Sequence, residues 1–147
     1  MTPQVTAWLD RGVLEARLRP VDRAFARFLA SLDEGGDARV LMAAALVSRE
    51  LGEGHICVDV EGLADIEPML AEAEAWLPAS SLVGSANGDP ATPLVLDGGL
   101  LYLRRFWRDE ARVADAIVAR LGSAEMPADL AQELDRLFPA EADALNW

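Results

Sequence analysis

The 147-residue sequence contains no lysine, one histidine and one cysteine. The missing lysine excludes a P-loop nucleotide site, a Schiff-base enzyme and a Ser–Lys catalytic dyad within this chain. A single cysteine excludes an internal disulfide framework and predicts a reducing, cytoplasmic location. No apolar run approaches the roughly twenty residues of a membrane span, and the first residues do not resemble a signal peptide. The sequence therefore predicts no membrane contact and offers few groups for catalysis.

Alanine and leucine dominate what is present, with 26 and 22 residues. Both are strong helix formers. The hydrophobic share of 52% is typical of a folded chain rather than a disordered one. A chain of 15.8 kDa has the size of one domain and buries enough surface for one core. The composition predicts a mostly helical domain.

The net charge of −12 is unevenly distributed along the chain. Residues 31–100 carry two arginines against thirteen acidic residues, whereas residues 1–30 and 101–120 each carry five arginines against three. So acidic a chain opposes the approach of duplex DNA. Arginine is well suited to protein interfaces, so the two arginine-bearing segments favour a protein partner. The alternative is an acidic surface that is simply solvated.

Helices are predicted on both sides of Pro20 before residue 33. Residues 2–18 form one or two short helices, with Thr2 as the cap and a weak point at Gly12. From Pro20 an amphipathic helix follows, and its apolar face is expected in the core: Val21, Phe25, Phe28, Leu29 and Leu32. The opposite face is expected to carry Asp22, Arg23, Ala26 and Arg27.

A central helix is predicted over residues 38–51, with Asp37 placed to cap it. Residues 40–47 are apolar without a break. A helix that is apolar on nearly every side is a buried one, so this helix should form the centre of the core. Residues 55–60 then alternate and predict a short strand with one shared apolar face: Ile56, Val58 and Val60.

The following residues predict a helix over 65–77, an exposed loop over 80–92 and a β-hairpin around the turn Asp97–Gly99. A helix over 104–121 is expected to bury Phe106, Val113, Ile117 and Leu121. The predicted fold class is therefore α+β and predominantly helical. We expect a helical bundle around the buried central helix (residues 38–51), with a small β-hairpin or three-stranded sheet.

The candidates for chemistry are few. His55 and Cys57 lie two apart on one strand face, but a Cys–His pair also needs an orienting group and an oxyanion site. With Asp59 they could ligate a metal, yet a closed zinc site takes four ligands, mostly sulfur or imidazole. Packing within the strand is the simpler interpretation. No catalytic, cofactor-binding or metal-binding residue is predicted.

Residues 101–108 combine three arginines with three aromatic residues at a strand-to-helix junction. This mixture suits contact with a partner's carboxylates or with stacked bases. In the alternative, Phe106 and Trp107 pack in the core and the arginines pair with local acids such as Asp97 and Asp109. The predicted partner-binding residues are Arg104, Arg105, Trp107 and Arg108, followed by Arg23 and Arg27.

Another class of function is a winged-helix-like nucleic-acid-binding module, with the turn Asp97–Gly99 as its wing. Exposed arginines clustered beside that turn would support it. The carboxylate at the turn and the acidic residues 31–100 oppose it. A small enzyme that uses His55 and Cys57 is a third class, and burial of both side chains away from any cleft would end it.

Four segments in the same order resemble RecD, the alpha subunit of bacterial exodeoxyribonuclease V. They are residues 21–29, 41–49 followed by 52–57, 81–84, and 93–107 with Glu110. The resemblance implies an N-terminal docking domain over 1–122 and a helical linker over 123–147, which leads toward an absent helicase motor. The parent subunit would be an ATP-dependent 5′-to-3′ helicase that uses ATP and Mg²⁺. This fragment lacks the ATP-binding motifs, so it should hold no cofactor and be inactive alone.

The resemblance also implies partners. The fragment would anchor the subunit to RecC, the gamma subunit, and through it to RecB, in DNA double-strand-break repair and recombination. DNA would be met only through the full complex. An apolar surface left without its motor predicts weak self-association of the isolated fragment, near Leu134, Leu137, Phe138 and Trp147.

Overall fold

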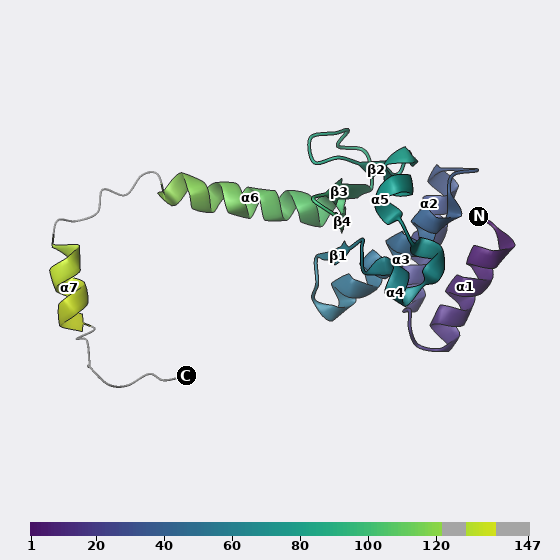
Figure 1. The fold of residues 1–147 in the computed structure, drawn as a ribbon, viewed down its shortest axis with the longest axis horizontal. Coiled ribbons are helices and arrows are strands. Elements are labelled where there is room, and N and C mark those ends of the chain that lie inside the picture. Colours follow the sequence, from purple (N-terminus) through teal and green to yellow (C-terminus); the bar gives the residue numbers. More distant parts are fainter. Residues whose placement is uncertain (122–128, 138–147) are drawn as a thin grey trace. The chain divides into compact units, whose positions relative to one another are not determined.

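The computed structural model describes residues 1–121 and 129–137, and its ribbon is drawn in Figure 1. The chain divides into two compact units, Met1–Ala111 and Arg112–Trp147. The first unit holds the core, and the second is helical where it is described. The predicted boundary at residue 122 and most of the predicted linker over 123–147 lie outside the described residues, so they stay predictions.

The first unit begins with two helices, α1 (Pro3–Leu14) and α2 (Pro20–Leu32). Thr2 caps α1, as predicted, by accepting a hydrogen bond from the Val5 amide. Gly12 does not interrupt α1. Instead it leaves room for Leu18, because a Cβ at Gly12 would lie 2.7 Å from the Leu18 Cδ1 atom. The chain can therefore turn tightly from α1 into α2.

The predicted central helix is α3 (Ala38–Glu53), and the structure confirms its buried position. Asp37 caps it by accepting a 2.9 Å hydrogen bond from the Arg39 amide. Gly54 ends it in the left-handed conformation (φ 94°), which costs glycine no steric strain. Every residue from Val40 to Ser48 is buried, which makes α3 the common support of α1, α2 and the sheet.

Within the described residues, four strands form one mixed sheet: β1 (Cys57–Asp59), β2 (Val83–Gly84), β3 (Leu94–Asp97) and β4 (Leu100–Leu103). Their order is β1-β4-β3-β2. The predicted hairpin is β3–β4, whose two-residue turn has φ 57° and 79° at Gly98 and Gly99. Both positive values favour glycine and match a type I′ turn.

The structure confirms the predominantly helical α+β class and adds a strand to the predicted sheet. β2 lies in the segment 80–92, which was expected to be an exposed loop. Its two residues pair in parallel with β3. A pairing this short carries no periodicity in the sequence.

The predicted single helix over 65–77 is wrong. The structure has short pieces there: α4 (Leu63–Ile66), η1 (Pro68–Leu70), α5 (Ala73–Trp76) and η2 (Leu77–Ala79). Pro68 lacks the amide hydrogen that a continuous helix needs. Glu72 takes the left-handed conformation with φ 56°. These two residues divide the segment. Of its predicted apolar stripe, Leu70, Ala73 and Trp76 are buried, whereas Ile66 and Met69 are exposed.

The predicted inward face of α2 is also wrong for most of its residues. Asp22, Ala26 and Leu29 are the residues that α2 buries, whereas Val21, Phe28 and Leu32 are 57%, 57% and 55% exposed. The small Ala26 permits close packing against α3. The buried polar Asp22 finds its partners there, and these contacts hold α2 in this rotation.

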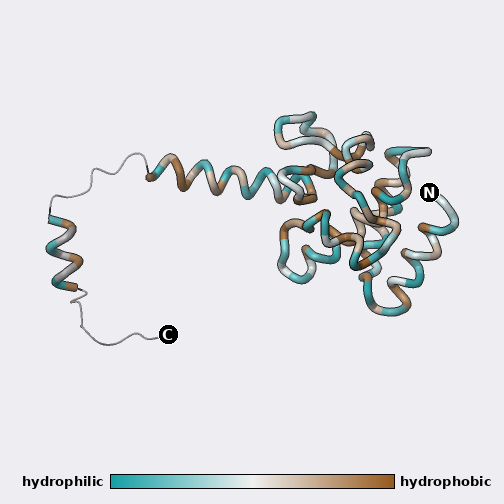
Figure 2. The backbone as a smooth tube through the Cα atoms, in the orientation of Figure 1, coloured by the Kyte–Doolittle hydropathy of each residue, from teal (hydrophilic) through white to brown (hydrophobic). Residues whose placement is uncertain are grey.

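α6 (Arg104–Leu121) contains no buried residue, so the prediction that it buries its apolar positions is wrong. Val113, Ile117 and Leu121 are exposed at helical spacing. Figure 2 shows hydrophobic and hydrophilic positions alternating along this helix. α7 (Leu130–Leu137) likewise exposes Leu134 and Leu137. Among the described residues, no helix is long and apolar enough to cross a membrane.

Candidate protein-interaction site

Asp22 fixes the position of α2. Its side chain is fully buried, and it accepts hydrogen bonds from the Arg19 amide at 2.7 Å, Arg19 Nη2 at 2.7 Å and Ser48 Oγ at 2.7 Å. Burial raises the pKa of the Asp22 carboxyl, but the hydrogen bonds from Arg19 and Ser48 outweigh it and the pKa lies below its usual value. Asp22 therefore remains charged in the folded protein.

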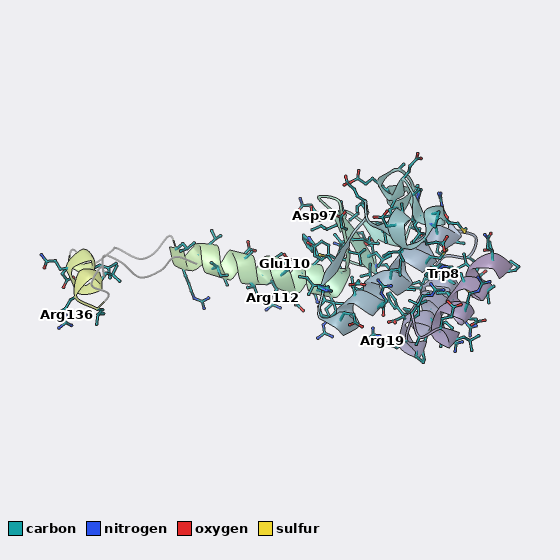
Figure 3. The ribbon with its side chains drawn as sticks, turned by 60° about the horizontal axis from the view of Figure 1, so that its bottom comes forward. Trp8, Arg19, Asp97, Glu110, Arg112 and Arg136 are labelled. Carbon is teal, nitrogen blue, oxygen red and sulfur yellow. The ribbon has the colours of Figure 1, made fainter. Side chains whose placement is uncertain are left out.

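Arg19, labelled in Figure 3, completes this cluster. Its guanidinium also donates to the Ser48 carbonyl of α3. It lies directly over Gly52, where a Cβ would come within 1.9 Å of Nη1. Because Gly52 has no side chain, the guanidinium can reach both the Asp22 carboxylate and the Ser48 carbonyl.

The two arginines predicted as secondary contacts, Arg23 and Arg27, lie on α2 and face α1. Both bond Asp10 Oδ1, at 3.0 Å and 3.3 Å. The three side chains are about one-third to one-half exposed. Ion pairs of this kind contribute about 0–1 kcal/mol each, so they align the two helices rather than hold them together.

Arg104, the first of the predicted contact residues, is built into the junction of β4 and α6. Its Nε donates to the Thr92 carbonyl at 3.2 Å, its Nη1 to the Ser85 carbonyl at 3.2 Å, and its Nη2 to the Thr92 hydroxyl. A Cβ at Gly84 would collide with both Arg104 and Thr92. Arg104 thus ties the segment 85–92 to the sheet and is occupied by this role.

Trp107 and Arg105 lie on the first turns of α6. Trp107 Nε1 donates to Asp97 Oδ2 at 2.9 Å, which joins α6 to the hairpin; Asp97 is labelled in Figure 3. Arg105 lies 3.8 Å from Asp109, and its side chain is 79% exposed. The pair of Arg105 with Asp109 matches the alternative drawn from the sequence, whereas Asp97 is bonded by Trp107 and not by an arginine. Arg105 nevertheless remains accessible.

The hairpin turn is acidic. Asp97 is its first residue, and Glu74 Oε1 lies 3.3 Å from the position of a Cβ on Gly99. A wing that enters a groove of DNA needs positive charge at its tip. Carboxylates at this position oppose the winged-helix alternative.

A hollow of about 340 Å³ lies between α2 and the start of α6. Phe25 lines it from α2, and Leu103 lines it from β4. The remaining walls come from the loop before β3 and from three of the predicted contact arginines: Pro90, Ala91, Thr92, Pro93, Arg104, Arg105 and Arg108. The structure thus brings Arg104, Arg105 and Arg108 together around one hollow, whereas Trp107 is not among its lining residues.

His55 and Cys57 line a second hollow of about 300 Å³, with the ion pair of Arg49 and Glu50. His55 and Asp59 are exposed, and Cys57 is half-buried. The described residues contain no group of three His, Cys, Asp or Glu side chains that could hold a metal. Both His55 and Cys57 line this hollow, so the burial away from any cleft that would end the enzyme alternative is not observed.

Residues 15–73 match the family model of the N-terminal domain of RecD, a subunit of the RecBCD enzyme. This chain contains an N-terminal RecD domain. It is 36% identical to the RecBCD enzyme subunit RecD of Mycolicibacterium smegmatis over 127 residues, which cover 84% of the chain and 22% of that relative. It is 34% identical to RecD of Mycobacterium tuberculosis over 146 residues, or 95% of the chain and 24% of the relative. The chain spans about a quarter of the length of these relatives.

The match places α2, α3 and β1 within the RecD domain, and most of the hollow lies outside residues 15–73. Sequence reasoning did not assign Phe25 to the site, because it placed this residue in the core; it also missed the lining residues Leu103 and Pro90 to Pro93. The sequence did contain an indication of the role of Phe25. Phe25 and Phe28 lie in the same apolar stripe, and α2 has more large apolar side chains than its contact with α3 buries. What the sequence could not supply was the side of α2 that meets α3.

Proposed function

We propose that this chain is a non-catalytic docking part of a RecD subunit, and that it anchors the subunit to RecC. The observation that carries the proposal is a complete core accompanied by large exposed apolar side chains on α2 and α6. Single exposed apolar residues are ordinary, but rows of them at helical spacing are typical of surfaces that a partner covers.

We further propose that the parent subunit supplies the ATP- and Mg²⁺-dependent helicase activity from other parts. In this scheme it acts in the cytoplasm in double-strand-break repair, and it meets RecB and DNA through the complex.

The decisive experiment measures association of this 147-residue chain with purified RecC, by co-purification and by sedimentation of the mixture. We expect a stable one-to-one complex. Purified RecB alone serves as the matched protein control and should not be retained. Failure of the chain and RecC to associate would remove the proposal.

Two further arms separate the alternatives. Binding of the isolated chain to duplex DNA at physiological salt would favour the nucleic-acid module, and its salt dependence would report the number of phosphate contacts. Hydrolysis of ATP by the isolated chain would contradict a purely docking role. We expect neither.

A further inference from the structure

One helix face in the first unit is apolar and has no cover. The α2 stripe, defined as Val21, Phe25, Phe28 and Leu32, follows the spacing i, i+4, i+7 and i+11 along one side of the helix. It extends about 16 Å, at 1.5 Å per residue. Three of its four side chains are more than half exposed, and two of the four are phenylalanines. The buried contacts of Asp22 hold α2 in this rotation, so the stripe cannot turn inward without leaving a charge unpaired.

One residue of the α2 stripe, Phe25, also lines the hollow. Phe25 is the half-buried member of the stripe. Arg105 and Arg108 of α6 also line the hollow, and we name them the arginine rim. Both side chains are exposed, unlike that of Arg104, which is held by Thr92 and Ser85. Phe25 of the α2 stripe and the arginine rim therefore line the same hollow.

We infer that the α2 stripe and the arginine rim form the docking surface for the partner subunit, and that the bound element is a segment with apolar side chains beside carboxylates. This inference rests on the proposed function and names its contact surface. Apolar side chains of the partner would cover Val21, Phe28 and Leu32 and enter the hollow at Phe25. Its carboxylates would meet the guanidinium groups of Arg105 and Arg108, which suit such pairing by their planar donors.

Charge complementarity selects this occupant. The chain as a whole carries a charge of −12, so two exposed arginines beside an apolar row stand out from an acidic protein. Their positive charge favours a segment that places carboxylates at this spot. Duplex DNA fits poorly, because phosphates find no partner along the α2 stripe. Aromatic and arginine side chains together are also the composition of binding hot spots.

The test compares matched substitutions in the 147-residue chain with RecC as the probe. Phe28→Gln removes the most exposed aromatic residue of the stripe, and Leu14→Gln is its control, since Leu14 is 86% exposed and belongs to α1. The double variant Arg105→Gln/Arg108→Gln removes the rim. Its control is Arg11→Gln/Arg17→Gln, which changes the net charge by the same amount. Circular dichroism and urea unfolding check that every variant is folded.

We expect Phe28→Gln to raise the dissociation constant for RecC about tenfold or more, as truncation of a hot-spot aromatic does. The rim variant should weaken binding about fivefold. It should also reduce the salt dependence of binding, because exposed charges act mainly on the association rate constant. The control variants should bind as the parent chain does. A photo-crosslinking residue at Phe28 should link to RecC, at a segment that contains acidic residues.

The failures are distinguishable. If the unmodified chain does not bind RecC, the proposed function is wrong. If it binds and the stripe and rim variants bind equally well, the function stands and this surface is overturned. If Phe28→Gln abolishes self-association of the chain but leaves RecC binding intact, the occupant is a second copy and the inference is wrong. Crosslinking to duplex DNA in place of RecC would overturn it as well.

Discussion

Ser48 of α3 donates a 2.7 Å hydrogen bond from its hydroxyl to Oδ1 of Asp22 in α2, inside the core. A buried carboxylate without partners costs several kcal/mol, so this contact and those of Arg19 determine which side of α2 faces α3. The α2 stripe is exposed as a consequence. The polar cluster that stabilises the fold therefore also presents the apolar surface that we assign to docking.

Removal of the Asp22 charge should destabilise the protein strongly. Asp22→Asn keeps the shape of the side chain but loses the charged bonds to Arg19, and we expect the free energy of unfolding to fall by about 3 kcal/mol. Urea unfolding followed by circular dichroism measures it. Asp65→Asn is the control, because Asp65 is exposed, and it should change stability by about 0.5 kcal/mol or less. Equal stability of the two variants would contradict the assigned role of the cluster.

The stabilisation by Asp22 should depend on pH with a definite sign. The pKa of this carboxyl is lowered in the folded state from its usual 3.8, so its contribution is present above that value and is lost as the pH falls through the folded pKa. The stability difference between the parent chain and Asp22→Asn should thus be constant near neutral pH and shrink in acid. Asp37, whose pKa is also lowered, titrates in both proteins and cancels. A difference that grows on acidification would refute this.

The effect of Gly52→Ala on the free energy of unfolding should change sign when Arg19 is replaced. In the parent chain the new methyl group forces the Arg19 guanidinium from its site over α3, and we expect a loss of about 1 kcal/mol. In an Arg19→Ala background that collision is absent, and alanine should instead stabilise the helix by about 0.5–1 kcal/mol. A double-mutant cycle by urea unfolding tests the reversal. Additive effects would show that Gly52 and Arg19 are independent.

The phenol of Tyr102 should lose its proton at a higher pH than an ordinary tyrosine. Burial is the main cause that raises its pKa from 10.0 to about 12, with contributions from Cys57 and the carboxylates of Glu110 and Asp97. Because the sequence has a single tyrosine, the ultraviolet absorbance of tyrosinate reports this group alone. The folded state retains the proton more strongly, so stability should fall as the pH rises above 10. The urea-unfolded chain is the control, and a folded midpoint equal to its midpoint would contradict the assigned burial.

The isolated chain should self-associate weakly through its second unit. Leu134 and Leu137 are exposed on α7; Phe138 and Trp147, which the sequence adds to this group, lie outside the described residues. Sedimentation equilibrium of the parent chain should show a concentration-dependent mass that Leu134→Gln/Leu137→Gln removes. Leu14→Gln serves again as the control. A clean monomer at high concentration would argue against this surface.

Local signals in the sequence were sufficient for several elements. The unbroken apolar run 40–47 predicted α3 as the buried helix, since no side of it could face water. The turn Asp97–Gly99 predicted the hairpin, because two residues with positive φ in succession favour glycine. The arginine-rich junction 101–108 was recognised from composition alone, and three of its arginines do surround one hollow.

Other features depend on contacts between distant residues. The two-residue strand β2 exists only through its pairing with β3. The helix expected over 65–77 is divided where Pro68 and Glu72 leave helical geometry, and Trp76 instead donates to the Ala71 carbonyl and lies beneath Arg39. Periodicity records the apolar positions of such a segment but not the turns that bring them to the core.

By itself the sequence determined the chemistry and the class of fold: no lysine, little that could catalyse, a central helix that had to be buried and a hairpin with one possible turn. Only the tertiary structure decided which face of α2 enters the core. Helical spacing shows that one face of a helix is apolar. It does not show whether that face packs against the same chain or against a partner. Asp22 and Ala26 lie against α3. Val21, Phe28 and Leu32 remain exposed, because a buried charge must be paired whereas exposed apolar side chains cost less free energy.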